Sequence, residues 1–285
     1  MSERIDIAVI GGGPAGLSAA VNAVARGKSV RLFSAGENPL EKAENVDNYL
    51  GFYKISGAEM MQKFRLHAES LGITPEKGRV VNIMPMGDRF LINFGGNIVE
   101  ASAVILAIGV AKAKEIPGEG VLLGRGVSYC ATCDGMLYRN KNALVWGLAP
   151  DAVEETNFLS SIGVKVMLVA KGERPEELNS QIPFISGAVS EVVGEDFVTA
   201  ARVGDDIHRT DGIFILRSAI APAALVPGLE TEKGYIKVSR DMETGIAGLY
   251  AAGDCTGTPL QISKAIGEGL IAAQNAAKFI DKSKS

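Results

Sequence analysis

The chain has 285 residues, of which 47% are hydrophobic and 22% are charged, and its formal net charge is −4 at pH 7. At about 150 residues per domain, this length predicts two domains. The composition excludes collagen, coiled coils and small disulfide scaffolds. Because there is no excess of basic residues, neither nucleic acid nor a membrane is expected as a partner.

The first predicted elements are a strand, a glycine-rich turn, a helix and a second strand over residues 5–33, which form a βαβ unit. Gly11, Gly13 and Gly16 fit the pattern G-x-G-x-x-G directly after the strand, where this pattern binds a dinucleotide pyrophosphate. The alternative is a tight turn without a ligand. The acid that usually follows about 20 residues later is absent, and Ser34 ends the second strand, so the nucleotide's identity stays open.

Because glycines and Pro14 interrupt the uncharged stretch 7–25, we do not expect it to span a membrane.

Further along the chain, a capped helix is predicted over residues 56–71 and a buried strand over residues 101–109. Shorter strands are predicted at 213–216 and 248–253, and a final amphipathic helix at 262–279. The first βαβ pattern recurs in the second half of the chain, where Gly147 takes the place of Gly11 and Ala152 that of Gly16. The sequence therefore predicts two Rossmann-like units.

The predicted fold is α/β, with two Rossmann-like domains of three-layer ββα/βαβ type. Short polar segments near residues 112–117 and 235–241 mark the predicted crossings between them. The first domain is expected to be discontinuous, with residues 1–112 and 240–285. It is interrupted by a smaller domain, residues 113–239.

Cys130 and Cys133 form a Cys-x-x-Cys pattern that is followed at once by Asp134. This spacing allows a reversible disulfide, and the acid can move a proton to or from a leaving thiolate. A zinc site and an inert buried pair are the alternatives, but no second pair of ligands lies at a recognisable spacing, so no metal is expected. The cysteine content favours a reducing compartment, the cytoplasm, and Cys255 is expected to be a small packed side chain.

Gly253 and Asp254 end the predicted strand 248–253, just before the final helix. An aspartate there can hydrogen-bond a polyol chain, and the helix N-terminus near Gln261 and Ile262 offers backbone N–H groups to a developing negative charge. The alternative is an aspartate that only caps the helix.

Taken together, these motifs resemble the low-molecular-weight thioredoxin reductases, flavoproteins whose FAD domain is interrupted by a smaller domain with a redox disulfide. The resemblance runs along the whole chain, and CATCDG is its most specific string. The matching strings are GGGPAG (11–16), VDNYLGF (46–52), ISGAEMM (55–61), AIG (107–109), GRGVSYCATCDG (124–135), GYIKV (234–238) and AAGD (251–254).

The resemblance implies an oxidoreductase in which bound FAD reduces the disulfide and the disulfide reduces thioredoxin. By position, Cys133 faces the flavin, Cys130 attacks the partner disulfide and Asp134 donates a proton. It also implies a homodimer. The implied FAD-binding residues are Gly11, Gly13, Pro14, Ala15, Gly16, Ser34, Asn48, Val80, Ala107, Gly109, Gly253, Asp254, Gln261 and Ile262.

The second domain departs from the family's NADPH-binding pattern in its glycine turn. The turn G-L-A-P-D-A (147–152) places the methyl group of Ala149 where backbone must approach a pyrophosphate, and Pro150 removes a backbone donor. The family's arginine-rich motif is replaced by AKGERPEE (170–177), in which glutamates surround the two cations Lys171 and Arg174.

Two further departures follow. The strand FILRS (214–218) ends in Arg217 and Ser218 where the family has glycine, and segment 174–187 is too short for the usual helix. NADPH is therefore not expected as a cofactor.

Loss of this pocket makes the chain most similar to the ferredoxin-dependent flavin thioredoxin reductases, so the resemblance implies reduced ferredoxin as electron donor. Two alternatives stay open: an NADPH-dependent thioredoxin reductase, and a flavin-bearing redox switch that holds a partner without turnover. A second flavin in the vacated site is a related alternative.

Overall fold

The computed structural model describes residues 4–36, 38–110, 115–149, 151–217 and 221–283, with the side chain of Cys133 outside this part. The chain divides into two compact units, Met1–Ala111 with Ala221–Ser285 (unit 1) and Lys112–Ile220 (unit 2). The return crossing was predicted near residues 235–241, but residues 221–239 lie with unit 1. The reason is that the short helix α5 (Pro222–Leu225) packs against β4 (Val80–Met86).

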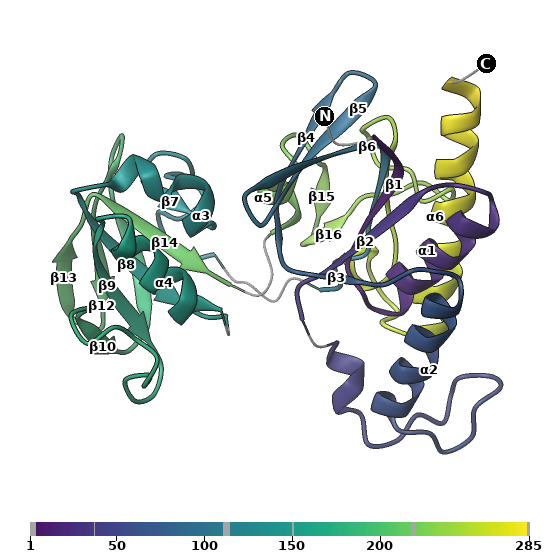
Figure 1. The fold of residues 1–285 in the computed structure, drawn as a ribbon, viewed down its shortest axis with the longest axis horizontal. Helices are drawn as coiled ribbons and strands as arrows, with labels where there is room; N and C mark the ends of the chain where they lie inside the picture. Colours follow the sequence, from purple (N-terminus) through teal and green to yellow (C-terminus); the bar gives the residue numbers. More distant parts are fainter. Residues whose placement is uncertain (1–3, 37, 111–114, 150, 218–220, 284–285) are drawn as a thin grey trace. The chain divides into compact units, whose positions relative to one another are not determined.

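Unit 1 is built on a seven-stranded sheet with the order β3-β2-β1-β6-β5-β4, and β17 pairs with β6 (Figure 1). Strands β3, β2, β1, β6 and β17 are parallel, whereas β5 and β4 continue from β6 as antiparallel strands. The other elements of unit 1 are β1 (Ile5–Ile10), α1 (Pro14–Ala25), β2 (Val30–Ser34), η1 (Pro39–Lys42), α2 (Gly57–Ser70), β3 (Glu76–Lys77), β5 (Arg89–Phe94), β6 (Asn97–Leu106), β15 (Thr231–Glu232), β16 (Tyr235–Ile236), β17 (Leu249–Ala251), η3 (Asp254–Thr256) and α6 (Ile262–Ser283).

Helices α1 and α6 pack side by side in unit 1 (Figure 1). Their backbones approach so closely that a Cβ on Gly269 would lie 2.3 Å from the carbonyl oxygen of Ala15. Buried alanines of both helices join strand residues such as Ile7 and Ile105 in one core. Helix α6 ends at Ser283, later than predicted, whereas α2 begins as predicted, with the N–H of Glu59 donating to the Ser56 hydroxyl at 3.2 Å.

Unit 2 has three layers. Its central sheet is parallel, with the order β10-β9-β8-β14-β7; one apolar core lies between this sheet and α4, and a second lies under the antiparallel sheet β11-β12-β13. The elements are β7 (Val127–Ser128), α3 (Ala131–Asp134), η2 (Gly135–Tyr138), β8 (Asn142–Gly147), α4 (Ala152–Ser161), β9 (Lys165–Ala170), β10 (Phe184–Ser186), β11 (Val189–Gly194), β12 (Val198–Val203), β13 (Asp206–Arg209) and β14 (Gly212–Leu216). The predicted second βαβ unit is therefore β8-α4-β9.

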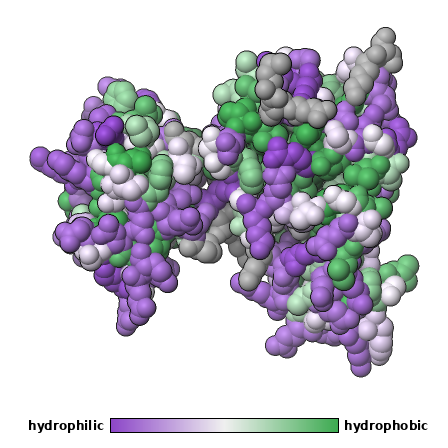
Figure 2. Space-filling view, in the orientation of Figure 1, coloured by the Kyte–Doolittle hydropathy of each residue, from purple (hydrophilic) through white to green (hydrophobic). Residues whose placement is uncertain are grey.

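The visible face of each unit is mainly hydrophilic, with hydrophobic residues in scattered groups (Figure 2). Within the described part of the chain, no helix is both long and apolar enough to cross a membrane. The predicted α/β fold with parallel sheets in two units is confirmed.

Candidate active site

The glycine turn of unit 1 follows β1 at the carboxyl edge of the sheet. Gly11 has a positive φ of +117°, and a Cβ there would lie 2.1 Å from the carbonyl oxygen of Ala107. A Cβ on Gly16 would lie 1.8 Å from the carbonyl oxygen of Gly11. Both positions therefore need glycine because backbone segments meet there.

Gly13 differs, because a Cβ there would meet only the side chain of Asn38, whose amide nitrogen would lie 2.5 Å away. Gly13 is the N-cap of α1, with Pro14 in the first turn, and among the described residues no side chain caps this helix and no acid lies in its first turn. Free N–H groups and the positive end of a helix dipole are favourable to a negatively charged group, so this helix start is a candidate place for a phosphate.

Four of the parallel strands of unit 1, namely β2, β1, β6 and β17, end side by side at this edge. The N–H of Gly11 donates to Phe33 at 2.8 Å, that of Ala107 to Ile10 at 2.7 Å, and that of Ala252 to Leu106 at 2.9 Å. The structure therefore brings together the predicted residues that follow or end these strands, namely Gly11, Ser34, Ala107 and Gly253. A Cβ on Gly253 would lie 2.8 Å from the Cβ of Ala15.

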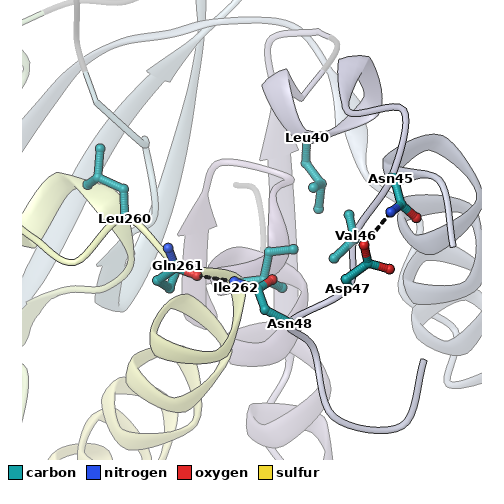
Figure 3. A pocket seen from close by; sticks show the side chains of 8 residues that line it. All are labelled: Leu40, Asn45, Val46, Asp47, Asn48, Leu260, Gln261 and Ile262. Atoms are coloured by element: carbon teal, nitrogen blue, oxygen red, sulfur yellow. Dashed lines mark hydrogen bonds between the residues drawn. The ribbon is translucent and has the colours of Figure 1, made fainter. Parts of the chain in front are cut away.

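Two predicted residues far apart in the sequence meet beside this edge. The side-chain amide of Asn48 donates to Oε1 of Gln261 at 2.8 Å, just before α6 begins at Ile262 (Figure 3). They line a cavity of about 460 Å³. Its other lining residues are Leu40, Asn45, Val46, Asp47, Leu260 and the predicted Ile262.

Two more predicted residues lie on segments that leave the same edge. The N–H of Gly78 donates to the carbonyl oxygen of Ser34 at 3.0 Å, and Val80, which is buried, begins β4 two residues later. Gly109 follows β6 with a φ of +67°, and a Cβ there would meet no atom of the described chain within 4 Å.

Asp254 sits next to a network that the sequence analysis missed. Burial raises the pKa of the Asp254 carboxyl, an effect that Lys264 opposes and Glu268 reinforces. The ammonium of Lys264 donates to Gly253 O and Thr256 Oγ1 at 2.9 Å, and to Glu268 Oε2 at 3.0 Å. Oε2 of Glu268 also accepts the N–H of Gly253 at 2.8 Å. The sequence contained one indication of this network, because Lys264 and Glu268 are four residues apart in a predicted helix, a spacing that favours an ion pair.

The predicted redox segment of unit 2 runs from β7 into α3. Cys130 is disulfide-bonded and 7% exposed, and its N–H donates to Oγ of Ser128 at 3.1 Å. Cys133 lies in α3, but its side chain is outside the described part of the structure. Cys255 is free and buried, as predicted. Among the described residues, no group of three or more His, Cys, Asp or Glu side chains is placed to hold a metal.

Asp134 is tied to this segment through Ser128. The Ser128 hydroxyl donates to Oδ2 of Asp134 at 2.7 Å while it accepts the N–H of Cys130. The N–H of Ala131, between the two, donates to Oε2 of Glu155 in α4 at 3.0 Å. One hydroxyl thus connects the predicted proton donor with the backbone of Cys130.

The second glycine turn differs from the first in the charge beside its helix. Helix α4 has Asp151 as N-cap and Glu154 and Glu155 in its first turn, whereas the described first turn of α1 has no acid. Acids at this helix end repel a phosphate by Coulomb forces and occupy the positive end of the dipole.

Arg174, one of two cations predicted in the replaced phosphate motif, binds the chain itself. Its Nη1 donates to Ile182 O at 2.8 Å and its Nη2 to Asn179 O at 2.7 Å. The described residues of the segment 174–187 form the short strand β10 and no helix. The sequence showed the loss of arginines here, but not this backbone role.

Known proteins resemble this chain over nearly its full length. Residues 5–269 match the family described as pyridine nucleotide-disulphide oxidoreductase. A thioredoxin reductase of Bacillus subtilis (strain 168) is 32% identical over 99% of this chain and 97% of its own. Two solved structures of a ferredoxin-flavin thioredoxin reductase from Clostridium acetobutylicum are 44% and 40% identical, with TM-scores of 0.90 and 0.88, and cover 98% and 99% of this chain and 99% of their own chains. The chain therefore belongs to the pyridine nucleotide-disulphide oxidoreductase family and is a thioredoxin-reductase-like flavoprotein.

Proposed function

We propose that this protein reduces thioredoxin, with FAD bound in unit 1, a redox disulfide between Cys130 and Cys133 in unit 2, and reduced ferredoxin as electron donor. The observation that carries the proposal is the contrast between the two glycine turns. The turn of unit 1 leads into a helix with a free N-terminus, while the turn of unit 2 leads into one with three acids.

The residues of unit 1 fit FAD. A pyrophosphate needs close backbone approach and free N–H groups, which Gly13 and the first turn of α1 provide. The ribityl chain is assigned to Asp254 and Asn48, and the ring to the segment from Gln261 to Ile262 at the start of α6. Val80 is assigned to the adenine. When bound, FAD supplies a group that accepts electrons singly and delivers them in pairs.

The disulfide of unit 2 carries the electron pair to the partner. Two electrons and two protons convert the Cys130–Cys133 disulfide into two thiols. The Cys130 thiolate then attacks the partner disulfide, and Cys133 resolves the mixed disulfide, so that the enzyme is reoxidised and the partner holds two thiols. Asp134, held by Ser128, protonates the leaving sulfur.

Electron entry through ferredoxin is supported by what unit 2 lacks for NADPH. Ala149 and the acids of α4 oppose a pyrophosphate, and Arg174 already donates to Ile182 and Asn179. The ferredoxin-flavin thioredoxin reductase from Clostridium acetobutylicum is similar over 98% of the chain. The homodimer and the cytoplasmic location stay predictions from the resemblance and the cysteine content.

The proposal is tested by anaerobic turnover with oxidised thioredoxin as acceptor. We expect new thioredoxin thiols with reduced ferredoxin and none above background with NADPH, and we expect Cys130→Ser to abolish turnover while the flavin stays bound. Cys255→Ser is the matched control and should turn over like the wild type. Equal turnover of wild type and Cys130→Ser, or turnover with NADPH alone, contradicts the proposal.

A further inference from the structure

A buried ion pair lies inside unit 2, between residues that are 98 positions apart in the sequence. Arg217 follows β14, and both terminal nitrogens of its guanidinium donate to the Glu119 carboxylate, with Nη2 and Oε2 2.8 Å apart. Glu119 is fully buried and Arg217 is 8% exposed. This bidentate arrangement gives the strongest hydrogen bonding between an arginine and a carboxylate.

The remaining contacts hold the pair in place. Oε1 of Glu119 accepts the phenol of Tyr129 at 2.9 Å, and Oε2 accepts the N–H of Ile116 at 3.0 Å. Burial, and then the Glu119 charge, raise the pKa of Tyr129, so its hydroxyl remains a donor. The guanidinium carbon of Arg217 lies 5.2 Å from the ring centroid of Trp146, a cation–π contact.

The pair sits where such sheets bind ligands. Strand β8 lies between β9 and β14 in the sheet. The chain reaches β9 directly from β8 through α4, whereas β14, on the other side of β8, comes much later in the sequence. In open parallel sheets, ligands bind outside the carboxyl ends of the strands at such a switch point. Trp146 is the penultimate residue of β8 and Arg217 follows β14. The N–H of Leu148 donates to Leu216 O at 2.8 Å, which holds the two strand ends together.

We propose that the Arg217–Glu119 pair, packed on Trp146, fills the switch-point crevice of unit 2 and keeps a pyridine nucleotide out. The inference rests on the proposed function and deepens it, because it names the side chains that exclude the other donor. A nucleotide entering here must displace the guanidinium from Glu119, which leaves a buried carboxylate without its partner. Its phosphates also carry the same sign of charge as that carboxylate.

Nucleotide binding can be measured without turnover because Trp146 is the chain's single tryptophan. We would titrate the flavin-loaded protein with NADPH and follow Trp146 emission, with free tryptophan as the control for absorption by NADPH. Four proteins are compared: the wild type; a turn variant, Ala149→Gly/Pro150→Ala; the turn variant that also carries Glu119→Gln/Arg217→Ala; and the turn variant that also carries Tyr129→Phe. Glu119→Gln accompanies Arg217→Ala so that no unpaired charge is buried.

We expect saturable quenching only in the turn variant that lacks the ion pair, with an affinity at least about tenfold above that of the turn variant alone. Tyr129→Phe keeps the pair and should not bind. Saturable binding by the wild type overturns the inference, even where a variant fails to fold. The inference is also overturned if the turn variant binds NADPH with equal affinity with and without the ion pair, or if neither form binds it. Failure of ferredoxin to reduce the flavin overturns the proposed function instead and leaves this binding result standing.

Discussion

The Ser128 hydroxyl donates a 2.7 Å hydrogen bond to the Asp134 carboxylate and at the same time accepts the N–H of Cys130. Ser128 is therefore a positioning residue for the proton donor. We expect Ser128→Ala to lower kcat for thioredoxin reduction by on the order of tenfold, with KM for thioredoxin unchanged, because the acid is no longer held toward the leaving sulfur. Steady-state kinetics with varied thioredoxin measures both constants.

Ser186→Ala is the matched control for this variant. Its exposed hydroxyl also makes one hydrogen bond in unit 2, to Gly172 O, but it has no contact with the redox segment. Its kinetics should equal those of the wild type. A raised KM with unchanged kcat in Ser128→Ala contradicts the positioning role.

Gly13 and Gly16 should respond differently to substitution by alanine. A Cβ on Gly16 would lie 1.8 Å from backbone oxygen, so Gly16→Ala should lower the free energy of unfolding by about 2 kcal/mol or more. A Cβ on Gly13 meets only the movable Asn38 amide, so Gly13→Ala should change stability by less than about 0.5 kcal/mol but release FAD more readily.

Urea unfolding and the flavin retained after gel filtration measure the two effects of these glycine substitutions. Gly27→Ala is not a suitable control, because Gly27 has a φ of +71°. Gly267 in α6 is suitable, since a Cβ there would meet no atom of the described chain within 4 Å. If Gly13→Ala retains all of its flavin, the prediction that Gly13 contributes to the cofactor site is wrong.

Arg174 should act on stability and not on nucleotide affinity. Its hydrogen bonds to Ile182 and Asn179 close the segment before β10, so Arg174→Met should cost about 1 kcal/mol of unfolding free energy. Lys171→Met is the control, because Lys171 is exposed and should stay within about 0.5 kcal/mol of wild type. Unchanged stability in Arg174→Met, with altered NADPH binding, would point to a phosphate site instead.

Cys255 should resist alkylation in the folded protein. Burial raises the pKa of its thiol to about 12, so only roughly one molecule in ten thousand carries the thiolate at pH 8. The rate of labelling by iodoacetamide should therefore rise about tenfold per pH unit above pH 8. Mass spectrometry should find Cys255 unlabelled at pH 8 until guanidinium unfolds the chain; rapid labelling of native protein would show that this thiol is not buried.

Local patterns were sufficient to predict the elements that form the proposed cofactor site. The strand, glycine turn and helix at residues 5–25 follow from Val/Ile runs, clustered glycines and Pro14, and the structure has them as β1, the turn and α1. The second βαβ unit was predicted for the same reason. The helix at residues 56–71 was signalled by the Ser56 cap.

Contacts between distant residues could not be predicted in this way. The pairing of Arg217 with Glu119 spans 98 positions, and neither residue's neighbours show a period that indicates it. The boundary near residue 220 was missed because α5 is only one turn long and gains its burial from β4, which lies far back in the chain. The acids of α4 were visible in the sequence, but their effect depends on where the helix begins.

Anaerobic flavin spectroscopy with each donor in turn tests the central claim most directly. The purified protein should be yellow, stoichiometric NADPH should leave its visible absorption unchanged, and reduced ferredoxin should bleach it. Subsequent oxidised thioredoxin should restore the colour in the wild type but not in Cys130→Ser. Rapid bleaching by NADPH, or no bleaching by ferredoxin, contradicts the account.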